Sequence, residues 1–170
     1  MTLSPGIQIV LGLPVVSAAM MLGLWLAQRR TKNAGIVDVG WATGIGILGV
    51  FFAVTSAGYG PRRVVVGILI GVWACRLAVH LLIDRILGQP EEGRYKRLRA
   101  DWGTKAERNL FGFFQIQAVL SLLFALPVLV VAHNSVSYLT AWDYLGIAVW
   151  AVAVGSTALA DRQLWQFKQR

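Results

Sequence analysis

Five long apolar runs, separated by short polar segments, dominate the chain. An α-helix rises about 1.5 Å per residue, so roughly 20 residues cross the hydrocarbon core of a bilayer. Each run is long enough to do so. The pattern therefore predicts an all-α fold, a polytopic membrane helix bundle, with transmembrane helices at residues 6–28, 35–56, 64–83, 110–132 and 142–160.

The composition supports the same class. Hydrophobic residues make up 56% of the 170 residues and charged residues 14%, with a mean hydropathy of +0.62, well beyond an ordinary soluble domain. The longest hydrophilic segment, residues 84–108, is flanked directly by apolar runs. We therefore expect residues 1–170 to form a single transmembrane domain.

The basic residues predict the orientation. If the N-terminus lies outside, thirteen of the sixteen Lys and Arg residues fall on the inner side, as the positive-inside rule requires. We expect a multi-pass protein of the inner (cytoplasmic) membrane, with its N-terminus outside and its C-terminus in the cytoplasm. The net charge of +8 is explained by contact with anionic membrane lipids, and we expect no nucleic-acid partner.

Several ionisable residues lie inside the predicted spans, where they are costly unless they are paired or hydrated. Asp38 lies one turn into the second span, and Arg76 and His80 stand four residues apart in the third, hence on one helix face. Asp84 continues that face. Two interpretations remain open: these residues line a polar cavity, or Asp38 pairs with Arg76 and locks two helices together.

A basic cluster follows in "GQPEEGRYKRLRADWG", which we expect to form a short helix beside the membrane. Such a cluster either binds lipid headgroups or, through its arginines and its tyrosine, holds the phosphates of a cofactor. The residues alone leave both alternatives open.

Five segments in order along residues 33–168, "NAGIVDVGW", "RLAVHLLIDR", "EEGRYKRLR", "FGFFQIQAVLSLLFALPV" and "ADRQLWQFK", resemble the DUF1295 family, bacterial membrane proteins related to steroid 5-alpha-reductases. The resemblance implies a seven-helix protein that reduces a carbon–carbon double bond conjugated to a ketone in a hydrophobic substrate, with NADPH as cofactor. It also implies that this chain is the N-terminal five-helix portion, with an incomplete cofactor site and no activity alone.

Carried over to this sequence, the resemblance implies two catalytic residues. Asp38 is the candidate acid that holds the substrate ketone, and His80 replaces the family's tyrosine donor, since residues 64–87 contain no tyrosine. Hydrogen bonds to the ketone oxygen stabilise the enolate that forms as hydride arrives. The implied cofactor-binding residues are Arg76, Arg85, Arg94, Tyr95, Thr157, Asp161 and Lys168, and no metal site is expected.

Other functions stay open. Asp161 with Arg162 also fits an interfacial charge pair at a helix end. Membrane methyltransferases that use S-adenosylmethionine share a similar helix plan. Asp38, Arg76 and His80 could relay protons in a small proton-coupled transporter, although the chain shows no repeated half such as many transporters carry. A structural membrane protein is the remaining alternative.

Overall fold

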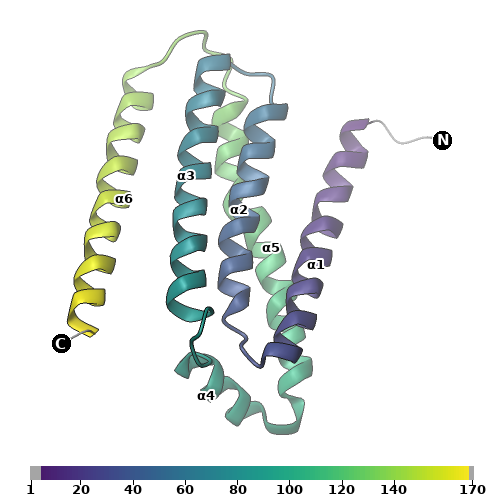
Figure 1. Ribbon diagram of the computed structural model, residues 1–170. Coiled ribbons are helices and arrows are strands. Elements are labelled where there is room, and N and C mark those ends of the chain that lie inside the picture. Colours follow the sequence, from purple (N-terminus) through teal and green to yellow (C-terminus); the bar gives the residue numbers. More distant parts are fainter. Residues whose placement is uncertain (1–4, 169–170) are drawn as a thin grey trace.

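The computed structural model describes the backbone of residues 5–168 and the side chains of residues 12–167. Within this part the chain is helical and contains no strand. Its elements are α1 (Pro5–Thr31), α2 (Ile36–Thr55), α3 (Gly60–Arg85), α4 (Gly93–Trp102), the 3₁₀ turn η1 (Gly103–Lys105), α5 (Ala106–Ala132) and α6 (Ala141–Lys168). The five long helices run side by side, and α4 lies across one end of them (Figure 1).

The predicted all-α membrane bundle is confirmed. Four segments of the described chain are long and apolar enough to cross a membrane, namely Ile36–Thr55, Gly60–Arg85, Gly93–Ala132 and Ala141–Phe167. The third of these includes the polar helix α4, so α5 supplies its apolar length. The predicted first span coincides with α1, which has 27 residues, but the side chains up to residue 11 lie outside the described part. That span therefore stays a prediction.

Helix α2 is the central element of the bundle. Over half of its apolar window, 56%, is buried, against none of the window in α6. Glycines make this packing possible, because a Cβ at Gly46 would lie only 2.4 Å from the side chain of Ala74 on α3. At Gly40 a Cβ would lie 2.1 Å from Leu24 on α1. Small residues thus bring α2 close to both neighbours.

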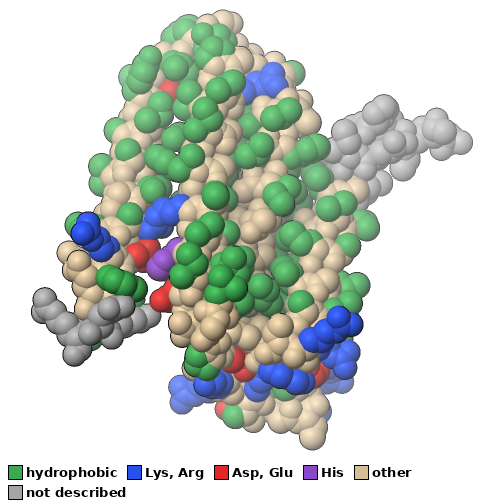
Figure 2. Space-filling model, in the orientation of Figure 1, with side chains coloured by type: hydrophobic (Ala, Val, Ile, Leu, Met, Phe, Trp, Pro, Cys, Tyr) green, Lys and Arg blue, Asp and Glu red, His purple; other side chains and the backbone are tan. Residues whose placement is uncertain are grey.

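Charged side chains gather at the end of the bundle that carries α4, which we call the basic end (residues 29–32 and 85–108) (Figure 2). Helix α4 is held there by Tyr95, whose side chain is fully buried. It packs in a core cluster with Val37 of α2 and with Leu110 and Phe114 of α5. The polar helix is therefore part of the folded bundle, in contact with α2 and α5.

Helix α6 stands apart from the other long helices (Figure 1). Among the described elements it packs only against α3. Its first turn is tied by Arg62 of α3, whose buried guanidinium donates to Asp143 at 2.8 Å and 3.0 Å. The same side chain donates to three backbone carbonyls of the α5–α6 loop, those of Asn134, Val136 and Tyr138. This contact fixes where α6 begins relative to α3.

Candidate functional site

The connection between α1 and α2 positions the first polar cluster. Lys32, directly after α1, has a positive φ of 56°, and Asn33 then joins the start of α2 to the end of α3. Its side-chain oxygen accepts from the backbone N–H of Gly35 at 3.0 Å, and its amide donates to the carbonyl of Arg85 at 3.0 Å. Because that carbonyl belongs to the last turn of α3, where carbonyls lack helical partners, Asn33 fixes the start of α2 against the end of α3.

Asp38, in the first turn of α2, is the centre of this cluster. Its carboxylate accepts hydrogen bonds from the Tyr95 hydroxyl at 2.9 Å, from Arg94 Nη2 at 2.6 Å and from Arg85 Nη1 at 3.2 Å. The same Arg85 nitrogen donates to Glu92 at 3.0 Å. Three helices, α2, α3 and α4, therefore meet at one carboxylate, which satisfies the requirement that a charge in an apolar helix be paired.

The Tyr95 hydroxyl serves this cluster as a donor. It accepts from Arg94 Nη2 at 3.1 Å while donating to Asp38, and the Arg94 guanidinium lies 4.6 Å from the centre of its ring. Burial, and then the negative charge of Asp38, raise the pKa of this phenol on the ten-residue helix α4. The hydroxyl therefore stays protonated, and Tyr95 acts by positioning Asp38 and Arg94 from inside the protein.

A second set of contacts at the basic end was missed by the sequence analysis. Arg99 of α4 donates to Glu91 at 3.0 Å, to Glu107 at 2.8 Å and to Gln28 at 2.5 Å. Gln28, which is fully buried at the end of α1, donates in turn to Glu107 at 2.9 Å. Glu91 precedes α4 and Arg99 lies within it, and these contacts join α1, α4 and α5.

The second polar cluster lies between α3 and α6. Arg76 pairs with Asp161, and His80 Nε2 lies 3.7 Å from the other oxygen of that carboxylate. The predicted common face of Arg76 and His80 is thus directed at α6. The predicted pairing of Asp38 with Arg76 is wrong, because α3 presents Arg76 to α6 and Arg85 to the start of α2. The ion pairs of Asp161 are made across to α3, and none with Arg162 is seen among the described residues.

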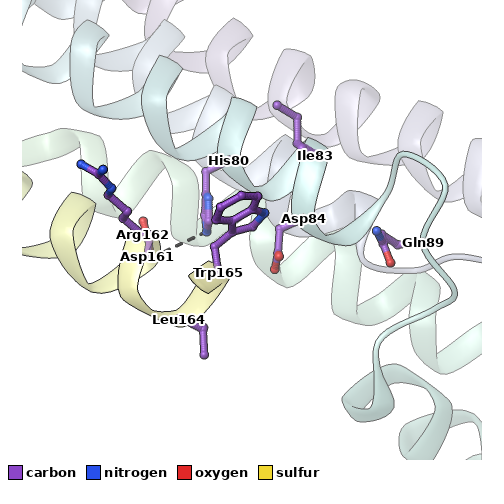
Figure 3. Close-up of a pocket in the computed structure, with 8 residues that line it drawn as sticks. All are labelled: His80, Ile83, Asp84, Gln89, Asp161, Arg162, Leu164 and Trp165. Carbon is purple, nitrogen blue, oxygen red and sulfur yellow. Dashed lines mark ion pairs between the residues drawn. The ribbon is translucent and has the colours of Figure 1, made fainter. Parts of the chain in front are cut away.

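This cluster borders a pocket of about 530 Å³ at the ends of α3 and α6. Figure 3 shows His80 and Asp161 joined as an ion pair, with Trp165 beside them. The volume lies within the range of small-molecule sites. The lining residues are His80, Ile83, Asp84, Gln89, Asp161, Arg162, Leu164 and Trp165.

The remaining predicted residues have different positions. Thr157 lies one turn before Asp161 on the exposed side of α6, and its hydroxyl donates to the carbonyl of Ala153 at 2.7 Å. Lys168 ends α6, and its side chain lies outside the described residues. Asp38 and His80, the two predicted catalytic residues, belong to separate clusters. Within residues 12–167, no group of His, Cys, Asp and Glu side chains is arranged to hold a metal ion.

Comparison with protein families gives one match. The family model described as "Protein of unknown function (DUF1295)" matches residues 24–170, which covers both polar clusters. A search of curated proteins finds no match, and a search of solved structures finds none.

Proposed function

The chain belongs to the DUF1295 family, and from that premise we propose that it is a membrane-embedded reductase that uses NADPH to reduce a conjugated carbon–carbon double bond in a hydrophobic substrate. One observation carries the proposal. Between α3 and α6, His80 and Asp161 line a pocket beside an arginine-rich end of the bundle, and Arg76 pairs with Asp161. Ionisable groups inside a membrane mark functional sites more often than packing sites, and the resemblance to steroid 5-alpha-reductases supports this chemistry.

The residues at the basic end fit a phosphorylated cofactor. In both Arg85 and Arg94, a single nitrogen makes all the side-chain hydrogen bonds within the described chain. A guanidinium has five N–H donors, so each retains donors for a phosphate oxygen. The two side chains are 34% and 49% exposed. In this proposal Asp38 and Tyr95 act indirectly, by holding the two arginines in place.

The pocket between α3 and α6 fits the uncharged end of the cofactor. It combines the flat ring of Trp165 with the polar side chains of His80 and Gln89. Its wall includes Asp161. One helix turn away lie Arg76, four residues before His80, and Thr157, four residues before Asp161. We assign these residues, with Lys168 at the end of the same helix, to the nicotinamide side of the site.

The protein supplies the proton side of the reaction. When bound, the cofactor supplies a hydride, which adds to the carbon β to the ketone. His80 is placed to donate a hydrogen bond to the ketone oxygen, where negative charge develops, and so to stabilise the enolate. From its imidazolium form, His80 then gives one proton to the α carbon of the enolate and is left as neutral imidazole, which completes the reduction. Asp161, 3.7 Å from Nε2, orients the imidazole.

The predicted orientation belongs to the same proposal. With the N-terminus outside the inner membrane, the basic end faces the cytoplasm, where NADPH is available. The anionic headgroups of that leaflet attract its lysines and arginines.

We expect NADPH to bind saturably to the protein in nanodiscs, as measured by nucleotide fluorescence. Arg94→Ala removes a phosphate donor and should weaken binding about tenfold, which corresponds to about 1.4 kcal/mol. Arg97→Ala is the matched control, since it removes the same charge from an exposed position of α4 that makes no contact with Asp38. Equal weakening by both variants would indicate only the net charge of α4 and would contradict the proposed site.

A further inference from the structure

The pocket in Figure 3 shares lining residues with a second cavity, which in turn shares lining residues with a third. His80 and Asp161 also line a second cavity of about 670 Å³, together with Arg76 and Ala158. Cys75 and Val79 line both that cavity and a third one, which is an apolar groove of about 670 Å³ between α2 and α3. The His80–Asp161 pair therefore separates the pocket at the basic end from a path that leads along the bundle surface.

The groove is lined mostly by apolar residues. Its lining includes the small residues Gly71 and Ala78 of α3, and Val50 and Phe51 of α2. At Gly71 an added Cβ would lie 3.5 Å from the Val50 side chain, in ordinary van der Waals contact. The groove runs from Thr43 to Val54 along α2, which is about 16 Å at the helical rise of 1.5 Å per residue.

The charged side chains around His80 and Asp161 indicate which kind of polar head group a bound molecule can have. Asp84 and Asp161 are the carboxylates of the two polar cavities, and Arg76 and Arg162 are their guanidinium groups. These charges balance, and Arg76 is already paired with Asp161. An anionic head group would lie beside a carboxylate, and the cavities have no surplus of positive charge to pair with it. Its binding would therefore be unfavourable, because burying an unpaired charge is costly. An uncharged head that accepts a hydrogen bond meets no such cost.

We propose that the substrate is an elongated amphiphile that enters laterally from the membrane, with its apolar chain in the α2–α3 groove and an uncharged, oxygen-bearing head at His80. The groove faces the region that lipid chains occupy around α2 and α3, both membrane-spanning segments. This proposal rests on the proposed function in one respect: it places the cofactor in the pocket of Figure 3, on the side of His80 and Asp161 away from the groove.

A photo-crosslinking experiment without nucleotide tests this assignment. The protein in nanodiscs is irradiated with a long-chain methyl ketone that carries a diazirine in its chain, and labelled peptides are mapped by mass spectrometry. We expect saturable labelling of the α2 and α3 peptides that line the groove. Unlabelled ketone should compete, and the matching long-chain carboxylate should compete several-fold less well.

Variants locate the label. Ala78→Leu fills the groove and should reduce saturable labelling several-fold, whereas Ala151→Leu makes the same change on the exposed side of α6 and should not. Val79→Trp, at a position 48% exposed, obstructs the path without disturbing the interior and keeps the test valid if Ala78→Leu fails to fold. Labelling that never saturates and is spread over α2, α3, α5 and α6 would overturn the proposal. So would equal competition by the carboxylate or by a rigid steroid enone. NADPH binding is measured in a separate experiment, so that failure of the proposed substrate groove can be distinguished from failure of the proposed cofactor site.

Discussion

Replacing Tyr95 with Phe removes one hydroxyl from the Asp38 cluster and leaves the buried ring in place. The ring keeps its edge-to-face contact with Phe113, whose centroid lies 6.2 Å away. The lost hydrogen bond to Asp38 is 2.9 Å long, and a hydrogen bond to a charged group contributes about 1.5–3 kcal/mol. Asp38 keeps its contacts with Arg85 and Arg94, so no unpaired charge is left. We therefore expect the free energy of unfolding to fall by about 1.5–2 kcal/mol, the lower part of that range.

The assay is equilibrium unfolding in mixed micelles, with the helical circular dichroism signal followed as the fraction of denaturing detergent rises. Tyr144→Phe is the control, because that side chain is 60% exposed and surface changes usually alter stability by less than about 0.5 kcal/mol. A double-mutant cycle with Asp38→Asn should give a coupling energy of about 1–2 kcal/mol. A loss of stability in Tyr95→Phe no larger than that in Tyr144→Phe, or a coupling energy near zero, would refute the stabilising role of the Tyr95–Asp38 hydrogen bond.

Two further predictions concern how the helices are held together. Gly46→Ala should lower the free energy of unfolding by about 1–3 kcal/mol through overpacking, because its methyl would lie 2.4 Å from a side chain on α3. Gly23→Ala, with open space around it, should instead be neutral or stabilising by up to about 1 kcal/mol. Equal effects of the two substitutions in the same detergent titration would contradict the close packing of α2 against α3. Arg62→Met removes the bonds to Asp143 and to the α5–α6 loop, so hydrogen exchange should become faster in that loop and in the first turn of α6. Arg63→Met, which loses bonds to the end of α2, should leave that exchange unchanged, and a similar rate in both variants would refute the role of Arg62.

The sequence was sufficient to predict the helices because their cause is local. A bilayer requires an apolar run of defined length, and the four runs from residue 35 onward coincide with α2, α3, α5 and α6. Helix α6 continues to Lys168, beyond the predicted end of the membrane span at residue 160, because the polar segment "DRQLWQFK" has good helix formers and remains helical past the apolar run.

The sequence was not sufficient to predict which polar groups meet. The four-residue spacing of Arg76 and His80 predicted their common face, since that spacing is a property of one helix. The partner of each depends on how helices are placed relative to each other. Asp38 therefore pairs with Arg85 and Arg94, and Arg76 with Asp161 from a helix 85 residues along the chain.

Tyr95 shows the same limit. A tyrosine beside the acidic residue was expected from the third helix, and its absence from residues 64–87 indicated His80 as a replacement donor. In the structure the tyrosine that bonds Asp38 comes from α4. Helix α4 folds back over the end of α2, where the core contacts of Tyr95 with α2 and α5 hold it.

The measurement that tests the central claim most directly is a competition between cofactors for the same protein in nanodiscs. NADPH fluorescence is titrated first, and S-adenosylmethionine is then added to the saturated sample. We predict that NADPH binds saturably, that Asp161→Asn weakens it, and that S-adenosylmethionine does not displace it. Binding of S-adenosylmethionine by folded protein that does not bind NADPH would contradict the reductase proposal and favour a methyltransferase-like function.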